Sequence, residues 1–218
     1  MHLQVFRHAT MHLSLPEGTL LIDPMLSAQG ALDPVTHSPH PRANPLVSLP
    51  LTAKEIVKNS DACLVTHLHR DHFDAAAAQL LPKDLPIICP PFAAAALQEQ
   101  GFTAVQAAAP QAQWQQLRLT LTKGQHGLGE IGRQMGDVAG FVLTGPAMPS
   151  IYLAGDTVWC PEVAKALTTH QPDIIILYGG GARFTHADPI TMTETDILTV
   201  GRHAPQAQVI VVHMEAVQ

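Results

Sequence analysis

The stretch His67-Leu68-His69-Arg70-Asp71-His72 places three imidazoles and one carboxylate within six residues. Its first two histidines follow a short apolar run at 62–66, and side chains two residues apart on an extended or loop backbone point to the same side. Both imidazoles can therefore converge on one ion. The aspartate and the last histidine can face a second ion beside the first. Because a helical site would use i, i+4 spacing, the stretch predicts a loop-borne metal centre.

Histidine is unusually frequent in this chain, with 13 histidines against 12 lysines and arginines together. An excess of the commonest metal-ligating side chain supports a metal site. Three further candidate ligands follow apolar runs later in the chain, namely His126, Asp156 and His213. Alone, each is typical of a surface, turn or capping residue. Their shared position at the ends of expected strands makes them candidates for the same site.

The chain alternates apolar runs typical of strands with segments typical of helices. Strands are expected within 3–15 and at 19–23, 62–66, 86–89, 117–122, 140–144, 150–154, 174–177 and 209–212, and helices at 73–80, 92–100, 161–170 and 191–203. Sheet with interposed helices recurs in each half, which favours an α/β fold of two packed sheets with helices outside. The length of 218 residues suits one domain, residues 1–218.

Three segments allow two interpretations each. The proline-rich segment 34–50, with His37, Arg42 and Asn44, is either a lid over the site or a simple connection. Gly179-Gly180-Gly181 is either a tight turn that lets the backbone approach the metals or an ordinary loop. Asp23 is either a hydrogen-bond partner of a ligating histidine or a turn residue before a proline.

Composition excludes several classes of function. The net charge is −6 and no Lys/Arg-rich run occurs, so neither nucleic acid nor an anionic membrane surface is an expected partner. No apolar stretch approaches about 18 residues, and the N-terminus lacks the features of a signal peptide. Three separated cysteines without a CxxC pair fit a reducing compartment, so we expect a cytoplasmic protein. No serine lies in a GxSxG context, which disfavours a serine hydrolase.

The HxHxDH string at 67–72 resembles the signature of the metallo-β-lactamase superfamily. Four looser motifs resemble its L-ascorbate-6-phosphate lactonase-like branch of metal-dependent hydrolases: Phe6-Arg7-His8-Ala9-Thr10, Asp23-Pro24-Met25, Gly155-Asp156-Thr157 and His213-Met214-Glu215-Ala216. The resemblance implies a four-layer αββα sandwich with a dinuclear site at one edge of the sheets. Members of the branch usually continue for some tens of residues past the last histidine, whereas this sequence ends at Gln218.

The resemblance also implies a ligand set. The first ion would be held by His67, His69 and His126; the second by Asp71, His72 and His213; and Asp156 would bridge them. These nitrogen and oxygen donors suit two divalent ions, Zn²⁺ or Mn²⁺, and also Fe. Asp71 is the candidate catalytic residue, because it can both ligate and orient the attacking hydroxide.

Candidate substrate contacts are His8, Arg133, Arg183 and His186. The two arginines could clamp an anionic phosphate or carboxylate, with ordinary surface salt bridges as the alternative. The predicted function is metal-dependent hydrolysis of a small ester, lactone or phosphoester.

Alternatives to this function are an iron-dependent oxidoreductase on the same scaffold, a phosphodiesterase or nuclease, and a non-catalytic binding protein. The absence of a basic stripe disfavours a nuclease. Seven polar donors buried together are costly to keep unused, which disfavours a degenerate binding protein. Hydrolysis of β-lactams is not expected without a signal peptide. Relatives of the branch often self-associate, so a homo-oligomer is compatible with the resemblance.

Overall fold

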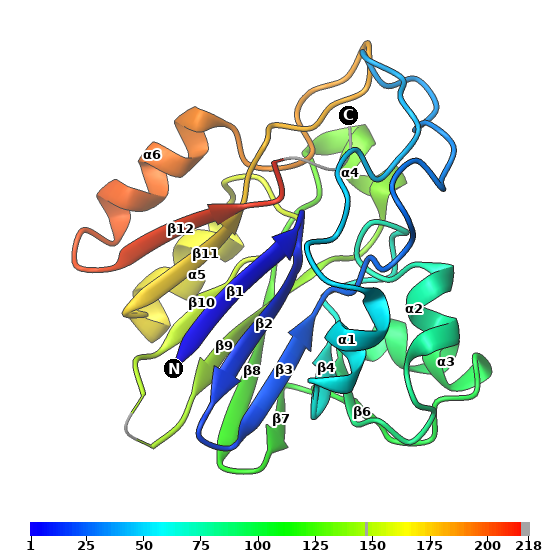
Figure 1. The fold of residues 1–218 in the computed structure, drawn as a ribbon. Coiled ribbons are helices and arrows are strands. Elements are labelled where there is room, and N and C mark those ends of the chain that lie inside the picture. Colours follow the sequence, from blue (N-terminus) through cyan, green and yellow to red (C-terminus); the bar gives the residue numbers. More distant parts are fainter. Residues whose placement is uncertain (147, 215–218) are drawn as a thin grey trace.

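The computed structural model describes residues 1–146 and 148–214, and its strands form two six-stranded sheets (Figure 1). The motif residues Glu215 and Ala216 therefore lie outside the described residues. The first sheet has the order β1-β2-β3-β4-β5-β6. Its strands are β1 (His2–Arg7), β2 (Thr10–Leu15), β3 (Gly18–Ile22), β4 (Ala62–Leu64), β5 (Ile87–Cys89) and β6 (Val105–Ala107).

The second sheet has the order β12-β11-β10-β9-β8-β7. Its strands are β7 (Gln111–Trp114), β8 (Leu117–Lys123), β9 (Ala139–Thr144), β10 (Ile151–Leu153), β11 (Ile174–Tyr178) and β12 (Gln208–Val212). In both sheets, antiparallel hairpins come first and parallel strands follow. Because β1 is parallel to β3, and β8 to β10, most strands of each sheet end at one common edge.

Five of the six helices in the described residues pack on the outer faces of the two sheets. The helices are α1 (Ala53–Lys58), α2 (Ala75–Leu80), α3 (Pro91–Glu99), α4 (Gly129–Met135), α5 (Pro161–His170) and α6 (Glu194–His203). Ile56 of α1 and Leu97 of α3 pack in one core cluster with Cys63 of β4. Val163 of α5 and Val200 of α6 pack in another with Ile175 of β11. The predicted αββα sandwich is therefore confirmed (Figure 1).

The largest core lies between the two sheets and follows from alternation along the strands. On β8, Leu117 and Leu119 are buried in this core, whereas Arg118 between them is exposed. Phe141 of β9 and Ile22 of β3 belong to the same cluster, so both inner faces contribute to it. The burial of this apolar layer fixes how the two sheets face each other, and hence which strand ends meet at the edge.

Several elements differ from the expectations. Four elements, α1, α4, β6 and β7, were not expected from the sequence. A signal for α1 existed, because Thr52 and Glu55 form a capping box at its start. The last helix begins at Glu194 and not at 191, because the hydroxyl of Thr193 accepts a hydrogen bond from the Asp196 amide and caps it. Among the helices of the described residues, none combines the length and apolar character that a bilayer-spanning segment requires.

The three cysteines, Cys63, Cys89 and Cys160, are free and buried. Burial raises the pKa of the Cys63 thiol well above its usual value and that of Cys89 to about 12. Because the thiolate is the reactive form, we expect a thiol reagent such as DTNB to label none of them in the native protein and all three after denaturation. Rapid labelling of the native protein would contradict the burial of these three side chains.

Candidate metal centre

The seven predicted ligands meet at the edge where the parallel strands end. His67, His69, Asp71 and His72 follow β4, His126 follows β8, Asp156 follows β10 and His213 follows β12. Their nitrogen and oxygen atoms form overlapping groups whose members lie within 4.8 Å of one another. The order of the strands in the two sheets thus brings residues from four separate segments to one place.

The first group consists of His67, His69 and His126. The Nε2 atom of His67 lies 3.0 Å from Nδ1 of His69. His126 donates from Nδ1 to the carbonyl of Ile190 at 2.7 Å, so its Nε2 lone pair faces the site. The Thr66 hydroxyl donates to Asp23 and lies 3.1 Å from Nδ1 of His67, from which it can accept. These contacts turn two Nε2 atoms toward a shared position, as ligating histidines require.

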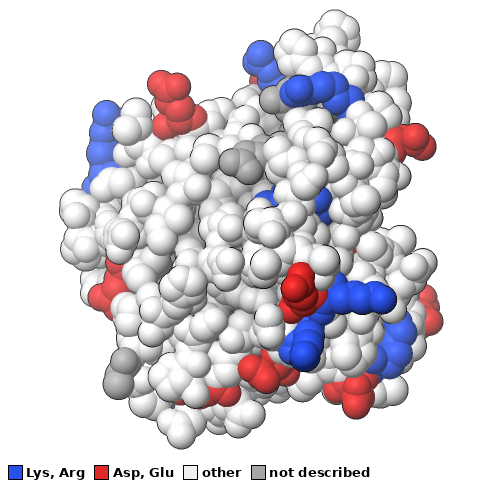
Figure 2. All heavy atoms as spheres, viewed as in Figure 1, with Lys and Arg blue, Asp and Glu red and all other residues white. Residues whose placement is uncertain are grey.

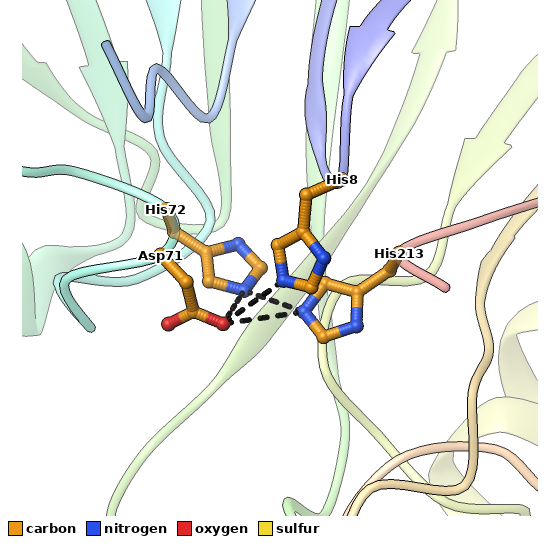
Figure 3. Close-up of side chains that lie close together, drawn as sticks. All are labelled: His8, Asp71, His72 and His213. Atoms are coloured by element: carbon orange, nitrogen blue, oxygen red, sulfur yellow. Dashed lines mark hydrogen bonds and ion pairs between the residues drawn. The ribbon is translucent and has the colours of Figure 1, made fainter. Parts of the chain in front are cut away.

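The second group contains Asp71, His72 and His213 together with His8 (Figure 3). The Oδ2 atom of Asp71 lies 3.6 Å from Nε2 of His72 and 3.4 Å from Nε2 of His213. The two histidine Nε2 atoms are 3.1 Å apart. All of these side chains are buried except that of Asp71, which is 15% exposed. Asp71 is therefore the member of this group that reaches the surface of the cavity above the site.

Asp156 lies between the two groups. Its Oδ2 is 3.4 Å from Nε2 of His126 and 3.3 Å from Nε2 of His72, while its Oδ1 is 3.2 Å from Nε2 of His213. The preceding Gly155 has φ +70°, and a Cβ there would lie 2.3 Å from the carbonyl oxygen of Ala139. Only glycine fits this position. The tight turn that it allows directly before Asp156 places the carboxylate of Asp156 between the two groups.

Asp23 supports the site from behind. Its carboxylate accepts hydrogen bonds from the amide and hydroxyl of Thr66, from Nδ1 of His72 at 3.0 Å and from the Tyr178 hydroxyl at 2.7 Å. Of its two interpretations, the one as a partner of a candidate ligating histidine is confirmed by this contact. Because Nδ1 of His72 donates to Asp23, Nε2 is the ring nitrogen that faces the site.

The charges in the site favour a cation. Burial alone would raise the pKa values of Asp71 and Asp156, but the surrounding histidines lower both well below the usual value. Burial, followed by the proximity of other histidines, lowers the pKa values of His67 and His69. Burial opposes charge on His72, yet Asp156, Asp71 and Asp23 raise its pKa well above the usual value. Ionised carboxylates beside the neutral imidazoles of His67 and His69 are the donor chemistry of divalent transition metals. The same negative charge that raises the pKa of His72 attracts a metal cation, whose binding displaces the extra proton of that ring.

A cavity of about 440 Å³ opens over these side chains. His69, Asp71, His126, Asp156 and His213 form part of its lining, as does the predicted substrate contact Arg183. The segment 34–50 supplies Val35 and Pro39 to the wall, and the carbonyl of His37 accepts hydrogen bonds from Thr185 of the opposite loop. The segment therefore forms part of the cleft wall, which agrees with a position beside the site; its action as a lid stays a prediction.

The structure does not bring the other candidate substrate contacts to this cavity. His8 belongs to the second ligand group. Arg133 lies on exposed α4, where its guanidinium pairs with Glu130 one helical turn away. His186 lines a neighbouring depression. Arg133 and His186 are not among the described residues that line the cleft, because the turn of α4 and the course of the loop direct them elsewhere.

Sequence reasoning missed several residues of the site. Tyr178 ends β11, donates to Asp23 and stacks on His213 with ring centroids 5.5 Å apart. It follows the expected strand at 174–177, so the rule that found the other residues at strand ends could have found it. Phe184 and Ile190 line the cleft but follow no strand directly, and no local pattern marked them. Arg70 also lines it; it lies within the 67–72 stretch but is not one of the donors that this stretch predicted.

Residues 19–214 match the family model described as the beta-lactamase superfamily domain. The chain belongs to the metallo-β-lactamase superfamily. The predictions of this superfamily and of a metal-dependent hydrolase within it are thereby confirmed. One curated superfamily relative, the UPF0173 protein YddR of Bacillus subtilis (strain 168), is 38% identical over 225 residues, covering 100% of this chain and 87% of its own.

Two solved structures resemble this superfamily member over nearly its full length. A possible metal-dependent hydrolase from Veillonella parvula DSM 2008 is 32% identical with a TM-score of 0.94, covering 99% of this chain and 86% of its own. The isothiocyanate hydrolase from Delia radicum gut bacteria is 34% identical with a TM-score of 0.93, covering 100% of this chain and 86% of its own. None of these three relatives is named a lactonase.

Proposed function

We propose that this superfamily member is a hydrolase that uses two divalent ions, Zn²⁺ or Mn²⁺, to activate water against a small electrophile with an apolar group. The observation that carries the proposal is the convergence of seven nitrogen and oxygen donors on one cleft, with Asp156 facing both groups. Two ions held there would lower the pKa of a shared water toward neutrality and polarise the electrophile.

Asp71 is the residue we assign to catalysis. Its carboxylate is the least buried member of the second group and lies on the wall of the cleft. From this position it can accept a hydrogen bond from the attacking water and so orient its lone pair toward the substrate. In the hydrolysis of an ester or lactone, the water oxygen bonds to the carbonyl carbon, the bond to the leaving oxygen breaks, and a proton from water passes to that oxygen.

The walls of the cleft support an apolar substrate group. Val35, Met135, Phe184 and Ile190 line it from three different segments, and its volume of about 440 Å³ suits a small molecule. Charged side chains of both signs are scattered over the face drawn in Figure 2, which favours a small compound over a long polyanion. The 34% identical isothiocyanate hydrolase adds isothiocyanates to esters and lactones as substrates to test. Arg183 at the wall is the contact that a phosphoester would use.

The proposal is tested by a substrate screen. Metal-free protein is reloaded with Zn²⁺ or Mn²⁺ and assayed with lactones, esters, phosphodiesters and isothiocyanates. His69→Ala should lose bound metal and at least about 100-fold in kcat/KM together, since losing even an outer partner of a ligand costs 10–100-fold. His2→Ala, at an exposed histidine at the start of β1, is the matched control and should change neither. Full activity in His69→Ala would discredit the site.

Phe184 should select substrates by their apolar group. Phe184→Ala removes part of the cleft wall, and losing the burial of an aromatic contact of about 1–2 kcal/mol should lower kcat/KM for bulky substrates about 10-fold. Steady-state kinetics with an aromatic and a methyl-substituted member of one substrate series measure this. An equal loss with both would show that Phe184 does not contact the apolar group.

A further inference from the structure

His8 lies inside the second ligand group, although its position early in the chain did not predict this. It occupies the turn between β1 and β2 and is 2% exposed. Its Nε2 is 3.1 Å from Oδ2 of Asp71, and its ring lies 3.6 Å, centroid to centroid, from that of His213. Figure 3 shows the four side chains turned toward one common point. They come from the β1–β2 turn, the loop after β4 and the segment after β12.

The spacing of the donor atoms matches a coordination shell. Neighbouring ligand atoms about 2.0–2.1 Å from a four- or five-coordinate ion lie about 2.9–3.6 Å from one another. The separations between Oδ2 of Asp71 and the three Nε2 atoms are 3.1 Å for His8, 3.6 Å for His72 and 3.4 Å for His213. Nε2 of His8 therefore lies as close to Oδ2 of Asp71 as do the Nε2 atoms of the two histidines already assigned to this group.

The backbone holds His8 and His213 together in an uncommon conformation. Their φ angles are +55° and +69°, and the amide of His213 donates to the carbonyl of His8 at 3.1 Å. Positive φ in residues other than glycine costs free energy and is concentrated at functional sites. Asp23, which supports His72, also has positive φ, at +44°. Of the six residues other than glycine with positive φ in the described chain, three thus belong to the second group or support it.

Apart from the contact between Nε2 and Asp71, no hydrogen bond to the ring of His8 is found among the described residues. Its Nδ1 is buried and has no hydrogen-bond partner among the described residues. Without an ion, a proton on Nε2 can donate to Oδ2 of Asp71 at 3.1 Å. When an ion binds, the proton can occupy Nδ1 instead, and the Nε2 lone pair is then available for coordination.

We propose that His8 is a fourth protein ligand of the second ion, through Nε2, alongside Asp71, His72 and His213. This inference rests on the proposed function, since it assumes that the cleft holds two ions. It makes the two positions unequal, because the first ion keeps only three histidines besides the shared Asp156. The second position is then the more saturated and the tighter of the two. The first, beside the cleft-lining His69, keeps room for water and substrate.

Metal binding tests the inference without an activity assay. Metal content and affinity are measured by mass spectrometry and calorimetry for the wild type, His8→Ala and His8→Gln. Glutamine places a donor near the position of Nε2 and can keep the hydrogen bond to Asp71, but it is a poor transition-metal ligand. Both variants should bind one ion normally and the second at least about 100-fold more weakly, a larger loss than an outer partner causes.

The control is His12→Ala, at a buried histidine of β2 whose Nε2 contacts Ser60 outside the ligand groups. It should bind two ions with wild-type affinity. Circular dichroism of the metal-free variants verifies the fold, and the visible spectrum of Co²⁺-loaded protein should lose the signal of one site in His8→Gln. If His8→Gln binds both ions as tightly as the wild type, His8 only orients Asp71 and the inference is wrong. A wild type that binds fewer than two ions would instead overturn the proposed function and this inference with it.

Discussion

Asp156→Ala is expected to release both ions and to lower kcat/KM by at least about 10³-fold, the equivalent of several kcal/mol of transition-state stabilisation. The reason is its position, because its two oxygens face His126 and His72 on one side and His213 on the other. Every other ligand serves one group, whereas Asp156 provides negative charge to both. Its removal also leaves the imidazoles of the two groups without the anion that lies between them.

The effect of Asp156 is measured as metal content after gel filtration, together with steady-state kinetics. Asp156→Asn separates charge from shape, because the amide keeps one oxygen donor but no negative charge, and it should bind the ions with intermediate affinity. Asp84→Ala is the control, because Asp84 is exposed and belongs to none of the ligand groups, and this variant should retain both ions. Two ions retained by Asp156→Ala would show that the carboxylate does not serve both groups.

Asp23→Ala is expected to destabilise the protein by about 3–5 kcal/mol, because removing one partner of a buried charged network leaves the others uncompensated. Asp23 is fully buried and accepts from Thr66, His72 and Tyr178, so its loss leaves several buried donors without an acceptor. The same change frees the ring of His72, which should weaken the second ion about 10–100-fold.

Urea unfolding of the metal-free protein measures the loss of stability, and calorimetry measures the loss of affinity. Tyr178→Phe is the matched comparison, because it removes only one hydrogen bond to the carboxylate of Asp23 and should cost about 1.5–3 kcal/mol. If Asp23→Ala were no less stable than Tyr178→Phe, the network around Asp23 would contribute little beyond that one bond.

Local sequence patterns determined most of the strands of this protein and the donors that follow them. The alternation at 117–122 predicted β8, and the apolar runs before His67, Asp156 and His213 predicted the strands that deliver them. The alternation of apolar and polar residues in a strand repeats within a few positions, so a strand can be recognised from the sequence without knowing the fold. The spacing of the 67–72 stretch placed four donors together because one loop carries them all.

Only the tertiary structure decided which distant residues share an ion. His72 contacts Asp23 across 49 positions and His213 across 141, and these contacts depend on the order of strands in two facing sheets. The same order drew His8 into the ligand group, while the turn of α4 directed Arg133 outward to Glu130. The physical reason is that burial of the apolar layer between the sheets sets their alignment, and no short stretch of sequence contains both sides of that layer.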